Sequence, residues 1–382
     1  AYLPILDILK SYFAINERER EYAVKKKMAN KIAQLDERLQ HILAPLHDLL
    51  SLEVEDEEYM KLEPPQKKER IFEAIRDLIL RESQNKPLII AIDDLQWIDK
   101  TSEDLLNYLI GWLGNTRVLL ILIYRLGYSH PWGTKSYYTR IHVDNLLAKS
   151  STELLQSILY DTEAMPELKE LIISRAEGNP LFIEEFTRNL MEMGYVEKRG
   201  HRYVLSVKTS AIQVPDTIQG IIAARIDRLG EDLKTTMQLA SVIGRDFIYR
   251  ILNIVTGMQK ELKSQLIKLQ ELEFIYEKSL FPELEYVFKH TITQEVSYNS
   301  LLLKKRKEIH EKVGIAIEEI YSDRLEEFYE KLAYHYSQSD NWEKAYQYYR
   351  LSADKLSERY FNWEAFRCYR EAIKSLKMLP AT

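Results

Sequence analysis

The sequence predicts a mainly helical chain with a small parallel α/β portion in its first part and helical repeats in its last part. Apolar residues recur at spacings of three and four over most of the chain, which is typical of helices with one buried face. Two short apolar runs, at 87–92 and 118–124, instead have the continuous pattern of strands buried on both sides. An Asn-Trp-Glu triplet that recurs near the C-terminus indicates a helical repeat.

The composition is that of a globular protein with two or three domains. The 382 residues are 46% hydrophobic and 29% charged, and the net charge of -6 provides no general attraction to nucleic acid or to an anionic membrane. Cys368 is the only cysteine, which excludes an intramolecular disulfide and fits a reducing compartment. No apolar run is long enough to span a bilayer, so we expect a cytoplasmic protein without a membrane contact.

The first part of the chain reads as helices followed by an α/β unit. Residues 1–83 have helical periodicity. The helical pattern of AYLPILDILKSYF begins at the first residue, so we expect the chain to be a fragment of a longer protein. The run from Pro87 to Ile92 is the first predicted strand, and the run from Val118 to Tyr124 is the second. Arg140 to Val143 is a third and weaker candidate. Strands that alternate with helices in this way predict a parallel sheet.

The middle of the chain reads as a helical segment and then a winged helix. Residues 151–193 are helical and are interrupted by Gly178-Asn179-Pro180, and a hairpin is expected from Tyr195 to Val207, turning near Arg199-Gly200. Helices from Pro215 to about Leu272 precede two short strand-like segments. These segments are Phe274 to Glu277 and Glu285 to Phe288, joined across Pro282. Three helices and a small hairpin are the elements of a winged helix.

The last part of the chain, from Leu301 on, is predicted to be all helix. Asn341-Trp342-Glu343 recurs as Asn362-Trp363-Glu364, and small residues accompany both copies. We interpret this as successive helices of a degenerate TPR-like array, with an ordinary helical bundle as the open alternative. The residues that support close helix packing are Ala345, Ala353, Ala365 and Ala372, and Tyr348 and Tyr369 share the offset of the triplets.

Asp93 and Asp94 are the strongest candidates for chemistry. They follow the first predicted strand, where open α/β sheets bind ligands, so Asp93 is expected to hold a hydrated Mg²⁺ and Asp94 to orient a water or the metal. The alternative for Asp94 is a helix cap. For Asp99, which precedes Thr101 and Ser102, we expect the cap.

Arg125 ends the second predicted strand. A guanidinium in that place can bind a γ-phosphate with two hydrogen bonds, and the alternative is an ordinary surface arginine. No GxxxxGK motif followed by Ser or Thr occurs, because Gly127 to Ser136 has the wrong spacing and is not followed by a helix. The histidines form no zinc motif.

A DNA-binding role for the winged helix is not favoured. Its candidate recognition helix, from Lys260 to Leu272, has apolar residues over much of its surface, and acidic residues offset its lysines. We therefore expect no nucleic-acid partner.

These segments together resemble the STAND class of P-loop, AAA-like ATPases, especially the region that follows the cyclase domain in bacterial adenylate/guanylate cyclases. The resemblance covers nearly the whole chain, through LIIAIDDLQWID, LLILIYR, AEGNPLFIEEF, PDTIQGIIAARIDRL, ASVIGRDF and VFKHTITQEVSYNSLLLKKRKEIHEKV. It implies ATP or ADP and Mg²⁺ as ligands, Walker B acids at Asp93 and Asp94, and a sensor arginine at Arg125. It also implies an adenine-proximal turn at Gly178, Asn179 and Pro180, and an ADP contact at His290. Because the motif at His290 reads FKH rather than MHD, a core histidine is the alternative there.

The resemblance also implies a division of the chain and a gap. The expected parts are the C-terminal portion of the NTPase domain (1–150), a helical lid with the Gly-Asn-Pro turn and a hairpin (151–207), a winged helix (208–298) and TPR-like repeats (299–382). In the family the phosphate loop and first strands precede the segment that AYLPILDILKSYF matches. We therefore expect the sheet to be incomplete and its portion of the chain to fold poorly, or to pair its strands differently.

The predicted function is part of an ATP/ADP-dependent signalling switch. Its TPR-like tail would sense a protein partner, and an upstream effector in the same polypeptide, by resemblance a nucleotide cyclase, would give the output. Without a phosphate loop this chain is not expected to hydrolyse ATP alone. The alternatives are a non-catalytic protein-binding scaffold with a degenerate ATPase domain and, less favoured, a winged-helix regulator that binds DNA.

Overall fold

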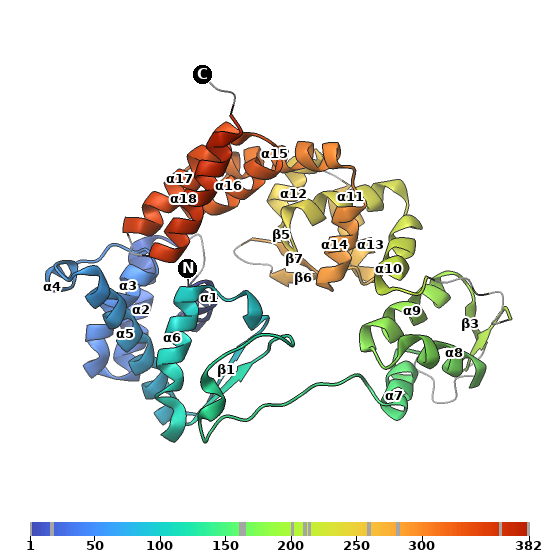
Figure 1. Cartoon of the computed structure of the whole chain (residues 1–382), viewed down its shortest axis with the longest axis horizontal. Helices are drawn as coiled ribbons and strands as arrows, with labels where there is room; N and C mark the ends of the chain where they lie inside the picture. Colours follow the sequence, from blue (N-terminus) through green and yellow to red (C-terminus); the bar gives the residue numbers. More distant parts are fainter. Residues whose placement is uncertain are drawn as a thin grey trace. The chain divides into compact units, whose positions relative to one another are not determined.

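The computed structural model confirms the mainly helical prediction (Figure 1), with 66% helix and a small parallel sheet. It describes residues 2–15, 19–159, 166–199, 202–208, 212, 215–257, 261–279, 283–358 and 361–379. The chain divides into two compact units, which are described separately. Unit 1 holds residues 1–140, 324–337 and 342–382, and unit 2 holds residues 141–323 and 338–341.

Unit 1 begins with helices packed around one apolar core. Ile5, Met28, Leu46 and Ile75, from four of these helices, are almost completely buried in it. The longest helix of this group is capped at Glu63 by a reciprocal pair of hydrogen bonds with Gln66, and Pro64 takes its first position. The helices are α1 (Leu3–Tyr12), α2 (Glu21–Leu35), α3 (Leu43–Leu49), α4 (Glu57–Met60) and α5 (Pro64–Asn85), with the 3₁₀ helix η1 (Glu37–Ile42).

The two predicted strands form a parallel pair in unit 1. Strand β1 (Leu88–Ile92) pairs with β2 (Val118–Leu122) from Leu88 opposite Val118 to Ile92 opposite Leu122, and α6 (Lys100–Ile110) connects them. One face of the pair packs against α6, whereas the other leaves Ile89 66% exposed. Leu119, on the same face of β2, is 56% exposed. Three 3₁₀ helices flank this region: η2 (Leu95–Trp97), η3 (Leu113–Asn115) and η4 (Trp132–Thr134).

The prediction of a third strand, from Arg140 to Val143, is wrong. These residues have no strand structure, and Ile141 and Val143 are 80% and 88% exposed. Alternating apolar residues form a stable strand only when a neighbouring strand accepts their backbone hydrogen bonds, and no described segment does so here.

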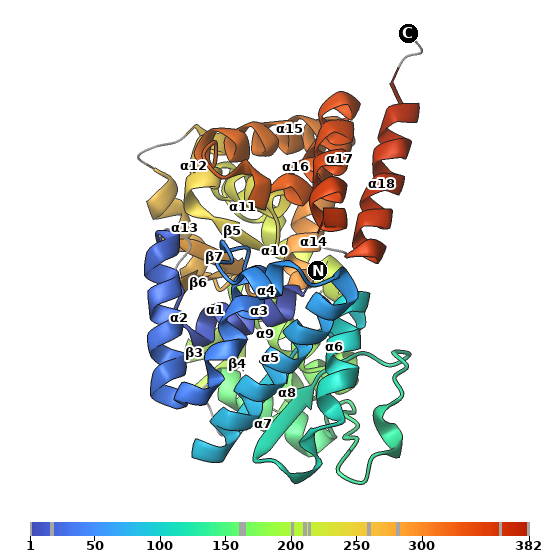
Figure 2. The same cartoon turned by 90° about the vertical axis from the view of Figure 1, so that its left-hand side faces the viewer.

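The last helices of unit 1 agree with the prediction that the end of the chain is helical. Figure 2 shows α17 and α18 side by side, and the four alanines at 345, 353, 365 and 372 are all at most 3% exposed. Small buried side chains let the two helix axes approach closely. The helices are α16 (Tyr329–Gln338), α17 (Trp342–Glu358) and α18 (Asn362–Lys377), preceded by η6 (Leu325–Glu327).

Unit 2 contains a helical group, the expected hairpin and a second group of helices with a three-stranded sheet. The hairpin pairs β3 (Val196–Arg199) with β4 (Arg202–Leu205), while Gly200 lies outside the described residues. The antiparallel sheet has the order β5-β7-β6, and the connection through Pro282 also lies outside the described residues. Its strands are β5 (Asp246–Ile248), β6 (Ile275–Ser279) and β7 (Glu285–Phe288). Its helices are α7 (Ala148–Leu159), α8 (Pro166–Ala176), α9 (Pro180–Glu192), α10 (Ile218–Asp227), α11 (Glu231–Ile243), α12 (Tyr249–Thr256), α13 (Leu262–Glu271), α14 (Thr291–Asn299) and α15 (Leu303–Ile320).

Among the described residues, no helix combines the length and the apolar character that a bilayer crossing requires.

Candidate functional site

The acid pair at the carboxyl end of β1 forms a tight turn. The Asp94 N–H donates to Asp93 Oδ1 at 2.7 Å, and Asp94 has a left-handed φ of 53°. Aspartate tolerates this conformation better than most residues because its short side chain hydrogen-bonds locally. Asp94 precedes η2, but its side chain makes no cap hydrogen bond, unlike that of Asp99, which caps α6 by accepting from the Ser102 N–H at 3.0 Å. The cap predicted at Asp99 is therefore confirmed.

Gln96 joins the acid pair to the end of the neighbouring strand. Its Nε2 donates to Asp94 Oδ1 at 2.7 Å, and its Oε1 accepts from the Arg125 N–H at 3.1 Å. The backbone adds a second link, because the Leu95 N–H donates to the Ile123 oxygen at 3.0 Å. The turn after β1 and the segment after β2 are thus held together. Asp93 and the side chain of Arg125 are exposed at this edge, where a ligand would reach them.

The chemistry of the acid pair fits a hydrated magnesium ion that shares its ligands with a phosphate. Mg²⁺ usually binds one or two protein carboxylates and takes its other ligands from water and substrate phosphates. Asp93 offers such an exposed carboxylate. Nowhere in the described part of the chain do three or more His, Cys, Asp or Glu side chains gather as a complete metal cage.

The Gly-Asn-Pro turn begins α9 in unit 2. Gly178 has a φ of +76°, and a Cβ on it would lie 2.3 Å from the oxygen of Leu146, so only glycine fits there. Asn179 caps α9 by accepting from the Phe182 N–H at 3.2 Å, and Pro180 takes the first helical position. The helix-breaking role that the sequence indicated is present.

His290 follows β7 and is the N-cap residue of α14. Its side chain is 28% exposed, so the alternative of a fully buried core histidine does not describe it. Burial lowers the pKa of the imidazole, and nearby Lys289 and Arg245 act in the same direction, against the opposing charges of Glu185 and Glu184. The ring is therefore mainly neutral at neutral pH.

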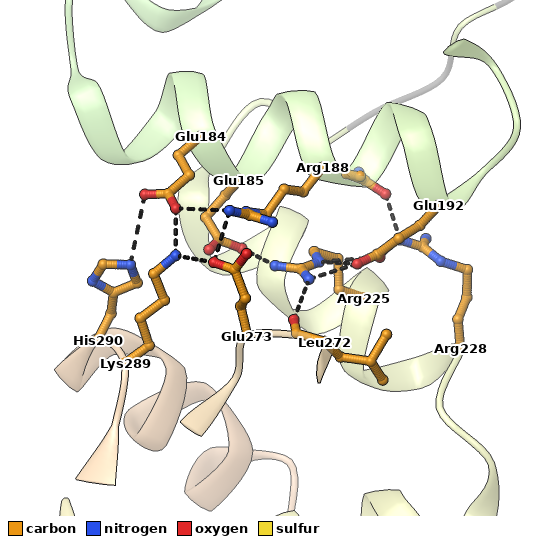
Figure 3. A network of polar contacts seen from close by, with 11 residues as sticks. Glu184, Glu185, Arg188, Glu192, Arg225, Arg228, Leu272, Glu273, Lys289 and His290 are labelled. Atoms are coloured by element: carbon orange, nitrogen blue, oxygen red, sulfur yellow. Dashed lines mark hydrogen bonds and ion pairs between the residues drawn. The ribbon is translucent and has the colours of Figure 1, made fainter. Parts of the chain in front are cut away.

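A network of charged side chains links α9 to α10 and to the segment around His290 (Figure 3). Arg225 of α10 is 2% exposed and binds Glu185 and Glu192 of α9, with its Nη2 also donating to the Leu272 oxygen at 3.2 Å. Lys289 forms ion pairs with Glu184 of α9 and with Glu273, the latter at 2.7 Å. This cluster fixes α9 in place from two sides.

The predicted site residues thus form two groups. Asp93, Asp94 and Arg125 lie at one edge of the parallel pair in unit 1. The Gly-Asn-Pro turn and His290 lie in unit 2, both near the N-terminal end of α9. Sequence reasoning missed Gln96 and Glu184. The sequence did contain a signal for each. Gln96 stands two residues after the acid pair, and Glu184 stands in the first turns of the helix that follows the Gly-Asn-Pro turn.

The N-terminal region matches a known family. Residues 9–122, which include β1, the acid pair and β2, match the AAA ATPase domain family. The match covers less than a third of the chain and agrees with the AAA-like ATPase part of the predicted resemblance.

Two particular proteins are similar to the chain. An uncharacterized protein of Rhizobium meliloti (strain 1021) is 24% identical over 259 residues, which are 67% of this chain and 25% of that protein. A STAND signal-transduction ATPase with a tetratricopeptide repeat sensor from Pyrococcus horikoshii has a crystal structure with 14% identity and a TM-score of 0.49. That similarity covers 94% of this chain and 51% of the other. The chain therefore spans about a quarter of the curated relative and about half of the solved structure.

Proposed function

We propose that the chain is part of an ATP/ADP-dependent signalling switch of the STAND class. The observation that carries this proposal is the acid pair Asp93-Asp94, of which Asp93 is exposed. Gln96 joins the pair to the backbone of Arg125, and the pair lies within the segment that matches an AAA ATPase domain. Carboxylates at the carboxyl end of one parallel strand and a guanidinium at the end of its neighbour suit a magnesium–phosphate ligand.

Each candidate residue has a role in this proposal. Asp93 holds Mg²⁺, Asp94 orients the metal or a water, and Arg125 binds the γ-phosphate. The Gly178-Asn179-Pro180 turn contacts the adenine, and His290 contacts the phosphates of ADP. An aspartate rather than a glutamate at Asp94 fits slow hydrolysis.

The rest of the chain is proposed to connect this nucleotide state to other proteins. Its parts are the NTPase portion (1–150), the lid (151–207), a winged helix (208–298) and the repeats (299–382), in a protein of the cytoplasm. The tail senses a protein partner, and an effector earlier in the same polypeptide, such as a nucleotide cyclase, gives the output. Exposed Trp363, Phe366 and Ile373 on α18 support a protein-binding role for the tail.

A non-catalytic scaffold is the second candidate. The 382 residues contain no phosphate-loop motif, and the exposed apolar side chains of α18 suit protein binding with or without nucleotide. DNA binding is the least favoured function, because the exposed face of α13 includes Ile267, which is 54% exposed.

Thermal melts with Mg-ATP and Mg-ADP separate the switch from the scaffold. A ligand at 100 times its Kd adds about 2.7 kcal/mol to the stability of the state that binds it. We expect a higher Tm with nucleotide for the full-length product of the gene, measured beside the 382-residue chain. Unchanged melts of the full-length protein with both nucleotides would support the scaffold instead.

Substitutions in the acid pair test the site itself. D93N and D94N are each expected to weaken Mg-nucleotide binding by roughly 10- to 100-fold, because each removes a charge-assisted contact of about 1.5–3 kcal/mol. R125A is expected to weaken ATP more than ADP, since its proposed partner is the γ-phosphate. D104N, which changes a partly exposed carboxylate on α6, is the matched control and should bind nucleotide normally. Wild-type affinity in all three site variants would disprove the assignment.

A further inference from the structure

Glu184 lies where the two proposed nucleotide contacts of unit 2 meet. It belongs to α9, whose first residue is Pro180 of the Gly-Asn-Pro turn, and its carboxylate is 4.0 Å from the Nε2 of His290. The same carboxylate binds Lys289 and lies 3.3 Å from the Nη2 of Arg188 (Figure 3). Lys289 and Arg188 therefore orient a carboxylate that faces the imidazole.

The imidazole of His290 has an unused hydrogen-bonding atom. Its Nε2 is buried and has no hydrogen-bond partner among the described residues. At 4.0 Å, the Glu184 oxygen lies just beyond hydrogen-bond distance. A buried polar atom without a partner is costly, so a small movement that brings Nε2 within reach of this acceptor is favourable.

The helix that presents Glu184 is firmly anchored. Arg225, which is almost completely buried, holds Glu185 and Glu192 of α9 on α10. An acceptor on a fixed helix can orient a neighbouring side chain, whereas an acceptor on a mobile segment would follow it. The backbone that carries His290 is fixed as well, since the Lys289 N–H donates to the Phe274 oxygen at 3.0 Å. The imidazole side chain is thus the group that adjusts.

We propose that Glu184 is a positioning residue for His290: its carboxylate accepts the Nε2–H of the imidazole in the absence of a ligand, and an anionic ligand competes for that same N–H. The ligand part rests on the proposed function of His290. The carboxylate and the phosphate of a bound nucleotide cannot both accept from one N–H, so ligand binding breaks a direct link between α9 and the segment after β7.

The charged groups around His290 define what a titration should show. Glu184 and Glu185 face it from α9, Lys289 precedes it in the chain, and Arg245 lies just before β5. Burial lowers the pKa of His290, while the two glutamates favour the protonated ring. Removing the charge of Glu184 should therefore lower this pKa further.

The experiment is an NMR titration of the 382-residue chain with ¹⁵N-labelled histidine. In the wild type we expect the neutral ring of His290 to carry its proton on Nε2. E184Q should lower the pKa of His290 and weaken this tautomer preference. E273Q is the matched control, because Glu273 also binds Lys289 and Arg188 but has no contact with His290. Its tautomer should remain that of the wild type.

Two results would overturn the proposal. One is an identical pKa and tautomer of His290 in the wild type and in E184Q, and the other is an equal change in E184Q and E273Q. If near-UV circular dichroism shows that E184Q is unfolded, E184D is measured in its place. Aspartate keeps the negative charge, but its side chain is one methylene shorter, so the carboxylate lies farther from His290. An intermediate tautomer population supports the positioning role, and wild-type behaviour contradicts it.

A second titration adds Mg-ADP to the full-length product of the gene, because the 382 residues contain no phosphate-loop motif. It keeps this test separate from the proposed function. If the His290 signals of the wild type change with ADP, the ligand competition is supported. If they do not, the ADP contact of His290 fails, while the comparison of E184Q with E273Q without nucleotide still judges the role of Glu184.

Discussion

Replacing Arg225 by methionine is expected to lower the free energy of unfolding by about 3–5 kcal/mol, the usual cost of leaving one member of a buried ion pair without its partner. The Arg225 side chain is 2% exposed and that of Glu185 is 4% exposed, so neither charge is solvated in the folded protein. Arg225 Nε also donates to both carboxylate oxygens of Glu192, at 2.9 and 3.0 Å. Its guanidinium lies 4.6 Å from the ring centre of Phe274. Methionine keeps part of the apolar packing but none of these bonds.

Urea unfolding of two further variants identifies the cause of this loss. R228M removes a neighbouring arginine that is 35% exposed, and its cost should be at most about 1 kcal/mol, as for an exposed ion pair. The double variant R225M/E185M should be more stable than R225M, because it leaves no unpaired carboxylate in the buried position. If the double variant is instead less stable than R225M, desolvation of Glu185 is not the source of the effect.

Lowering the pH from 7 to 4 is expected to remove about 3 kcal/mol of stability through His310 alone. His310 of α15 is 1% exposed, and the Tyr298 hydroxyl lies 3.0 Å from its Nε2. Burial, with a smaller effect of Arg306, lowers its pKa from 6.5 to about 4. Between these values the unfolded chain binds a proton that the folded chain does not, so stability is greatest above pH 6.5 and falls as the pH approaches 4.

The measurement is the difference in unfolding free energy between the wild type and H310Q at each pH. Glutamine keeps hydrogen-bonding capacity but does not titrate, so the advantage of the wild type should shrink by about 3 kcal/mol from pH 7 to pH 4. Carboxylates that titrate in both proteins cancel in this difference. H142Q, at a histidine that is 55% exposed, is the control and should unfold with the same free energy as the wild type at pH 7. A difference between the wild type and H310Q that is constant with pH would mean that folding does not change the pKa of His310.

Local sequence patterns predicted the elements of the chain well where burial is continuous. The apolar run at 87–92 contains β1, and the run at 118–124 contains β2, which ends at Leu122. Asp99 caps α6, as the following Thr101 and Ser102 indicated. The alanines of the tail lie at the contact of α17 and α18. The pattern at 140–143 misled, because an alternating run of four residues needs a partner strand and the sequence alone does not show whether one is available.

The sequence by itself determined the types of residue at the candidate site. An acid pair after one strand, an arginine after the next and a Gly-Asn-Pro break between two helices are all local features. Each depends on neighbours within a few positions, where helix and strand periodicity and the constraint on φ act directly.

Only the tertiary structure decided which of these residues meet. Gln96 connects Asp94 to Arg125 across 29 positions, and Arg225 lies 40 positions from Glu185. Glu184 approaches His290 across more than one hundred. Such pairs arise from the packing of whole helices and strands, and a charged residue on an otherwise ordinary helix face carries no local mark of its partner. Burial then decides how much each ion pair contributes to stability. An exposed pair contributes little, whereas removing one member of a buried pair leaves the other charge unsolvated and costs about 3–5 kcal/mol.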